Sequence, residues 1–293
     1  MDAAALVYQG LVGLSLAMSL WLVAAGLTLT FGVLGILNFA HGSLYMLGAY
    51  LGYMFYGSPL YGSLGLSFWL SVPLAALSVG VLGVVMERIF FRPLYHLNEA
   101  YFLILTFGFV LIFSDVVRIL WGGVFLIPPL PPGLTGSVRV LGRGFPVYDF
   151  FQMGAGVVIA VALWLLLDHT WWGRIVRATA SDREMASTLG VNTGRVFALV
   201  FGLAAMVAGL GGALSMPQQV VTSGLGTAII IEAFIITVIG GLGNLRGAFI
   251  AALIVGLANA YVALLFPAAS LFLIYLIMVF ILLLRPQGLF RGR

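Results

Sequence analysis

The feature that most constrains this chain is a long segment without charge. No Asp, Glu, Lys or Arg lies between Asp2 and Glu87, and the segment is apolar almost throughout. Backbone polar groups in lipid must be satisfied internally, which leaves only helices and closed β-barrels as spanning structures. Barrel strands alternate polar and apolar residues, whereas this run is continuously apolar. With 62% hydrophobic and 8% charged residues, against about 25% charged in soluble proteins, the chain is predicted to be an all-α, polytopic membrane protein.

The charged residues divide the rest of the chain into spans of about 20 residues each. Three spans are expected before Glu87, with turns at residues 37–42 and 56–63. Residues 1–9 carry no basic residue, so we expect the first apolar segment to be retained rather than cleaved as a signal peptide. Residues 1–293 are taken as one transmembrane domain of about eight to nine spans, because a helix broken near Asn38 would change the count by one. The later spans are expected at about residues 100–120, 150–167, 196–216 and 227–239, with two more between 247 and 284 that turn at 266–270.

The basic residues predict the orientation, because cytoplasmic loops carry an excess of them. All thirteen are Arg, and only Arg118, Arg139 and Arg143 fall on the opposite set of loops. We therefore expect the N-terminus outside and the C-terminus in the cytoplasm. The arginines assigned to the cytoplasmic side are Arg88, Arg92, Arg174, Arg177, Arg183, Arg195, Arg246, Arg285, Arg291 and Arg293.

Several classes of chemistry are excluded by residues that the chain lacks. It has no Cys, which removes disulfides, iron–sulfur ligation and thiolate catalysis. It has no Lys, which removes a Walker-type ATP site and Schiff-base chemistry. His41, His96 and His169 fall in separate segments without metal-ligand spacing. We expect no enzyme activity, no metal ion, no cofactor and no nucleic-acid partner for this chain.

The longest polar stretch, residues 169–195, is predicted to carry a short capped helix. Ser181 and Glu184 have the spacing of a capping box, and Gly190 suits a left-handed stop. Met185 and Leu189 then share one face of a helix of about eight residues. So short a helix is marginal alone. It either rests on its own bundle or the headgroup region, or docks into a groove on a cytoplasmic partner.

Polar residues inside the apolar segments are candidates for a translocation pathway, because they are costly in lipid and usually face a cavity. Asn38 and His41 are expected in a packed turn or unwound helix at the cytoplasmic end of the pathway. The structural alternative is that Asn38 caps a helix and His41 bonds a neighbouring carbonyl. Glu232 is expected in an ion pair, in contact with a substrate ammonium group, or in a watery lumen. For an ion pair, Arg118 could meet either Glu232 or Asp115.

The stretch GGLGNLRG lacks the spacing of a dinucleotide fingerprint. Its glycines, Gly240, Gly241, Gly243 and Gly247, are expected to form a tight cytoplasmic hairpin. GxxN occurs here at Gly241–Asn244 and also at Gly35–Asn38, which hints at an internal repeat.

Five stretches together resemble the permeases of ABC importers for branched-chain amino acids: GILNFAHGSLYMLGAY, ERIFFRPL, SDREMASTLGVN, VIGGLGNLRGAFIAALIVG and LRPQGLFRGR. The resemblance covers about residues 30–293. It implies a permease subunit in a bacterial or archaeal inner membrane, working with a second permease that is usually a different chain. Two cytoplasmic subunits would bind ATP, and a periplasmic or lipid-anchored binding protein would deliver a small amino acid. The short helix would be the coupling helix that contacts the ATPase, with Ser181, Asp182, Arg183, Glu184, Met185, Ala186, Leu189 and Gly190.

Two other functions stay open from the sequence. Permeases for urea or short amides share similar AHG and GGxG patterns, and the binding protein chooses the cargo. A stand-alone secondary transporter or channel is a different class. It would usually carry more buried charges than Glu232 and the Asp115–Arg118 pair.

Overall fold

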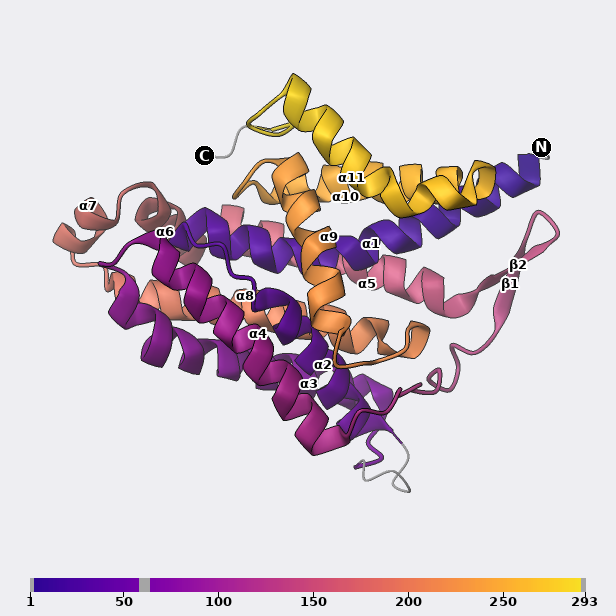
Figure 1. Cartoon of the computed structure of the whole chain (residues 1–293), viewed down its shortest axis with the longest axis horizontal. Helices are drawn as coiled ribbons and strands as arrows, with labels where there is room; N and C mark the ends of the chain where they lie inside the picture. The colour runs from indigo at the N-terminus through magenta and orange to yellow at the C-terminus, as the bar shows by residue number, and fades with distance from the viewer. Residues whose placement is uncertain (1–2, 58–63, 291–293) are drawn as a thin grey trace.

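The computed structural model describes residues 3–57 and 64–290 and shows a bundle of long helices (Figure 1). The predicted turn at 56–63 falls almost wholly outside the described residues. The first half contains α1 (Ala3–Leu34), α2 (His41–Tyr56), α3 (Phe68–Met86), a π-helical turn (Glu87–Phe91), a 3-10 turn (Arg92–Leu94) and α4 (Glu99–Trp121). The second half contains β1 (Ser137–Val140), β2 (Arg143–Pro146), α5 (Val147–Trp164), a π-helical turn (Leu165–His169), α6 (Trp171–Ser181), α7 (Arg183–Thr188), α8 (Thr193–Ser215), a 3-10 turn (Met216–Gln218), α9 (Leu225–Gly240), α10 (Leu245–Leu265) and α11 (Pro267–Leu284).

Six helical segments of the described chain are long and apolar enough to cross a membrane. Two further apolar segments, Leu225–Gly240 and Phe272–Leu284, are shorter. α2 has 16 residues and spans about 24 Å, less than the hydrocarbon core of about 30 Å. The structure therefore shows a polytopic helical bundle but does not confirm the expected count of eight to nine spans. The six segments are Ala3–Leu34, Phe68–Leu94, Glu99–Trp121, Val147–His169, Thr193–Gln218 and Leu245–Leu265.

The all-α prediction is wrong in the loop between α4 and α5, where β1 and β2 form an antiparallel hairpin. Leu141 and Gly142 join the strands with φ of 49° and 83°. Positive φ at both loop residues is what a two-residue hairpin turn requires, because this twist matches that of the strands. The alternation of Val and Arg before this Leu-Gly pair was the signal in the sequence.

Small residues allow the central helices to approach closely, as is usual for helix pairs in membranes. A Cβ on Gly48 of α2 would lie 2.2 Å from the Gly209 carbonyl oxygen of α8. A Cβ on Gly256 of α10 would lie 2.7 Å from Ala17 of α1. α1, α2 and α8 therefore form the buried centre of the bundle, while α4 and α11 expose large apolar side chains.

Helices α6 and α7 lie at one end of the molecule, and the hairpin and the start of α1 lie at the other (Figure 1). The expected orientation requires the short helix and the N-terminal end of the first span to lie on opposite sides of the membrane. The two lie at opposite ends of the molecule, and the orientation itself stays a prediction.

Candidate functional site

The short helix predicted from the sequence is α7, with two corrections. It has 6 residues, Arg183–Thr188, instead of about eight. Its cap is Asp182, whose Oδ1 accepts from the Met185 N–H at 2.9 Å, so the capping box at Ser181 is wrong. Ser181 instead ends the preceding helix, α6. Gly190 has a φ of 85°, which suits the residue after a helix end.

One face of α7 is buried and the rest projects into solvent. Ala186 is only 4% exposed, whereas Met185 and Leu189 are 57% and 78% exposed. Isolated exposed apolar residues are common, but Met185 lies in α7 and Leu189 directly follows it. Figure 1 shows α7 at one tip of the bundle. The bundle therefore presents a small apolar knob formed by Met185 and Leu189.

The base of α7 is held against the segment that follows α3. The Arg183 guanidinium lies over the rings of Tyr95 and Phe197, at 5.1 Å and 4.9 Å from their centroids. Arg92 donates to the Gly194 carbonyl at 2.6 Å and to Glu87 at 3.2 Å. These contacts fix the direction in which α7 projects.

Glu87 is the buried anchor of this segment. Its side chain is fully buried, and it accepts from Arg92 and from the Tyr95 hydroxyl at 3.0 Å. Removing one partner of a buried charge is costly, because the remaining charge is left uncompensated. Sequence reasoning missed this role and assigned the residue only to the end of a span.

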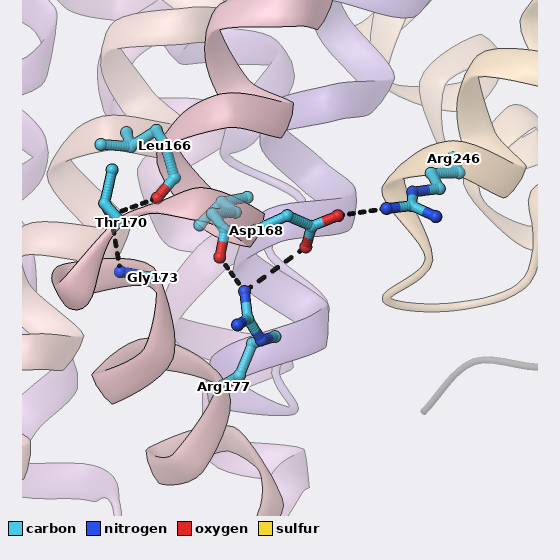
Figure 2. A network of polar contacts seen from close by, with 7 residues as sticks. Leu166, Asp168, Thr170, Gly173, Arg177 and Arg246 are labelled. Atoms are coloured by element: carbon cyan, nitrogen blue, oxygen red, sulfur yellow. Dashed lines mark hydrogen bonds and ion pairs between the residues drawn. The ribbon is translucent and has the colours of Figure 1, made fainter.

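Helix α6 was also missed, although its sequence WWGRIVRATAS has apolar residues on one helical face. Thr170 caps it by accepting from the Gly173 N–H at 3.0 Å (Figure 2). Gly173 and Val176 are buried against the bundle. The sequence predicts these residues only as part of a polar loop. In the structure they form a helix that packs on the bundle and leads directly into α7.

Asp168 links α6 to the start of α10 (Figure 2). Its Oδ1 pairs with Arg177 of α6 at 3.4 Å, and its Oδ2 accepts from Arg246 in the first turn of α10. Arg177 also donates to the Leu167 carbonyl. The Asp168 carboxylate therefore connects α6, which leads into α7, to the glycine-rich turn.

That glycine-rich turn joins α9 to α10. Gly240 ends α9, and Gly241 and Gly243 have φ of 96° and 82°. Asn244 caps α10 by accepting from the Gly247 N–H at 3.0 Å. A Cβ on Gly247 would lie 2.0 Å from the Gly240 carbonyl oxygen. The four predicted glycines are thus all in or beside a tight hairpin.

Asn38 and His41 lie at the other break, residues 35–40, which are not helical and separate α1 from α2. His41 is fully buried, and its Nε2 lies 3.2 Å from the Val23 carbonyl oxygen of α1. Asn38 is 1% exposed, and neither atom of its side-chain amide has a partner among the described residues. Asn38 does not cap α2, whose cap position is Ala40. The two residues therefore differ: His41 bonds a carbonyl, and Asn38 is unpaired.

Glu232 lies partly buried in α9 and, within the described chain, forms neither a hydrogen bond nor an ion pair. Arg118 lies 3.8 Å from Asp115, with both side chains largely exposed. Of the two pairings expected for Arg118, the one with Asp115 is confirmed, and the ion pair with Glu232 is absent from the described chain. Contact with a substrate or with a watery lumen stays a prediction.

A scan against protein families matches residues 11–282 to the model described as branched-chain amino acid transport system / permease component. The chain belongs to this family. This is a family of transport proteins, the permease components of ABC importers, and the matched range includes α7, the α1–α2 segment and the α9–α10 turn.

The curated relatives agree with this assignment. The permease LivH of Salmonella typhimurium is 30% identical over 209 residues, covering 69% of this chain and 68% of that protein. LivH of Escherichia coli K12 is 30% identical over 218 residues with the same coverage. LivM of Escherichia coli K12 is 26% identical over 232 residues, covering 70% of this chain and 52% of that protein. No solved structure matches the chain.

Proposed function

We propose that this chain is the LivH-like permease subunit of an importer for leucine, isoleucine or valine, driven by α7 acting as the coupling helix. The chain supplies the path and has no catalytic activity or cofactor of its own. ATP is bound by two cytoplasmic ATPase subunits, and a binding protein delivers the cargo to the opposite side. The N-terminus lies outside and the C-terminus in the cytoplasm of a bacterial or archaeal inner membrane.

The observation that carries this proposal is the exposed apolar knob of Met185 and Leu189 on a firmly anchored base. Exposed to water, these apolar side chains contribute little to stability, whereas a groove on an ATPase subunit would bury them. Aliphatic side chains gain about 1.5–3 kcal/mol each when fully buried. A movement of α7 would be passed to α8 through the contact of Arg183 with Phe197. It would be passed to α10 through the pairing of Asp168 with Arg246.

A second permease chain is also part of the proposal. LivH and LivM of Escherichia coli are both named permease proteins of a high-affinity branched-chain amino acid transport system. This chain is more similar to LivH than to LivM. We therefore expect a LivM-like chain to pair with it, with the exposed apolar faces of α4 and α11 shared between lipid and that partner.

The test replaces the knob with charge. In the Met185→Asp/Leu189→Asp double variant, two carboxylates would have to be desolvated in the ATPase groove. We expect ATPase recruitment and leucine uptake to fall at least about tenfold, the scale of an interface hot spot. The measurements are co-purification of the ATPase subunits and uptake into proteoliposomes that contain the whole importer.

Leu97→Asp is the matched control, because Leu97 is an exposed leucine at the same end of the bundle, 41% exposed, but outside α7. It should retain ATPase binding. If the double variant recruits the ATPase and transports leucine as the wild type does, α7 is not the coupling helix. Uptake by this chain alone, without ATP or partners, would point to a stand-alone transporter.

A further inference from the structure

The Asn38 side chain is unusual for a buried amide. A side-chain amide offers two donors and one acceptor, and buried polar groups are nearly always bonded. Asn38 is 1% exposed and uses neither Nδ2 nor Oδ1 within the described chain. The buried amide of Gln152 differs in part: its Nε2 donates to Ser19 at 2.7 Å and to Ser215 at 3.1 Å, and only its Oε1 has no partner in the described chain.

Asn38 lines a small apolar cavity. The cavity has a volume of about 10 Å³ and is lined, besides Asn38, by Leu27, Leu37, Phe39, Ile230 and Phe234. This is about the minimum room for one water molecule, which also needs two to four polar partners. The other five lining residues have aliphatic or aromatic side chains, so Asn38 supplies the one polar side chain of the lining. In this state the cavity is too small to hold an amino acid.

We propose that the Asn38 amide binds the α-amino-acid head of the cargo as it passes, while the surrounding apolar walls receive its aliphatic side chain. This inference rests on the proposed function, and it assigns to Asn38 the recognition of the cargo inside the membrane. The carboxylate of the cargo accepts from Nδ2, and its ammonium group donates to Oδ1. One amide can hold both because it is a donor and an acceptor side by side.

The same lining argues against urea as the cargo. Urea carries hydrogen-bonding groups on every side, and Asn38 supplies the one polar side chain of this lining. Unpaired polar groups in an apolar site are strongly disfavoured, which is the basis of selection against ligands that leave them. An aliphatic amino acid instead places its polar head on Asn38 and its apolar body on Leu27, Ile230 and Phe234.

The structure also shows how the site could open. The Phe39 ring stacks on Phe107 of α4 at 4.8 Å and lies 6.5 Å from Phe234 of α9. Phe39 and Phe234 line the cavity from two separate elements, and the stack on Phe107 holds the Phe39 ring from outside it. Gly35 begins the non-helical segment with a φ of 71°, and a Cβ there would meet nothing within 4 Å. Movement of this segment would draw Phe39 from the stack and widen the cavity beside Asn38.

The test uses the complete importer in proteoliposomes and the variant Asn38→Leu, which removes the amide but keeps a side chain of similar size. We expect leucine uptake to fall about tenfold, since a lost hydrogen bond to a charged group is worth roughly that factor. Assembly with the partner subunits and the ATPase activity stimulated by the loaded binding protein should stay within about twofold of wild type, because α7 is unchanged.

Asn259→Leu is the matched control, since it makes the same change in α10 at a residue that does not line the cavity. It should keep wild-type uptake. Wild-type uptake by Asn38→Leu would overturn the assignment of Asn38 while leaving the importer function intact. Failed assembly of Asn38→Leu would also overturn it, by showing that the amide is structural. If the wild-type importer itself moves no leucine, the proposed function fails first.

Discussion

Two connections between helices share the pattern GxxN but have opposite properties. One joins α1 to α2 and contains Gly35 and Asn38, and the other joins α9 to α10 and contains Gly241 and Asn244. Each begins with a glycine at positive φ and has an asparagine three residues later. The Asn244 side chain bonds the Gly247 N–H, whereas the Asn38 amide bonds nothing in the described chain. The shared pattern does not fix the role of the asparagine, which depends on its surroundings.

The two turns also differ in how firmly they are held. The α9–α10 turn is fixed by the Arg246–Asp168 pair and by the Leu289 N–H, which donates to the Ile239 carbonyl at 2.8 Å. The α1–α2 segment has the Phe39 ring stack and open space around Gly35. The α9–α10 turn is therefore suited to stay in place while helices move around it, and the α1–α2 segment is suited to move.

The largest expected effect is on the fixed turn. In Gly247→Val the new Cβ would lie 2.0 Å from the Gly240 carbonyl oxygen. The backbone cannot move aside without opening the hairpin, so we expect a loss of about 3 kcal/mol or more in stability. This corresponds to a fall of roughly 10 °C in the melting temperature of the purified permease.

Gly154→Val is the control for that variant, because a Cβ on Gly154 of α5 would meet nothing within 4 Å. It should melt as the wild type does, or slightly higher, since Val has the better helix propensity. If Gly247→Val melts like this control, the α9–α10 turn is not the fixed element of the pair.

Much of the bundle could be predicted from the sequence because long apolar runs permit few structures in lipid. The break near Asn38, the hairpin at Gly240–Gly247 and the short helix before Gly190 all have strong local signals. The predicted boundary at Ser181 failed because Ser181 and Asp182 are both good caps, and only the packing of α6 shows which one ends the first helix and which begins the second.

The contacts between distant segments could not be predicted in the same way. Nothing local indicates that Asp168 meets Arg246, 78 positions later, or that Arg183 lies over Tyr95. The absence of an Arg118–Glu232 pair from the described chain has the same origin, because spacing along helices does not say which faces meet. A polar residue in a span signals function or structure equally, and only its partners separate them.

An intermediate effect is expected when the cap of the fixed turn is removed. Asn244→Ala loses the hydrogen bond from the Gly247 N–H, and the loss of an N-cap costs about 1 kcal/mol. We expect the melting temperature to fall by about 2–4 °C. Asn244→Ser supplies another capping side chain and should recover most of the loss. An unchanged melting temperature in Asn244→Ala would mean that the Asn244 cap does not stabilise the fold, and Asn244 and Asn38 would then not differ in this respect.

The smallest expected effect is on the stability of Asn38→Leu, and its smallness is the informative result. Replacing a buried polar group that has no protein partner by an apolar one of similar size is close to neutral, since no bond is lost and less desolvation is needed. We expect a change within about 0.5 kcal/mol, less than that of Asn244→Ala under the same conditions. If Asn38 does not stabilise the fold but its loss reduces transport, its role is in contact with the cargo. A fall as large as that of Asn244→Ala would instead mean that Asn38 is bonded in the native protein, and the two turns would then differ only in their packing.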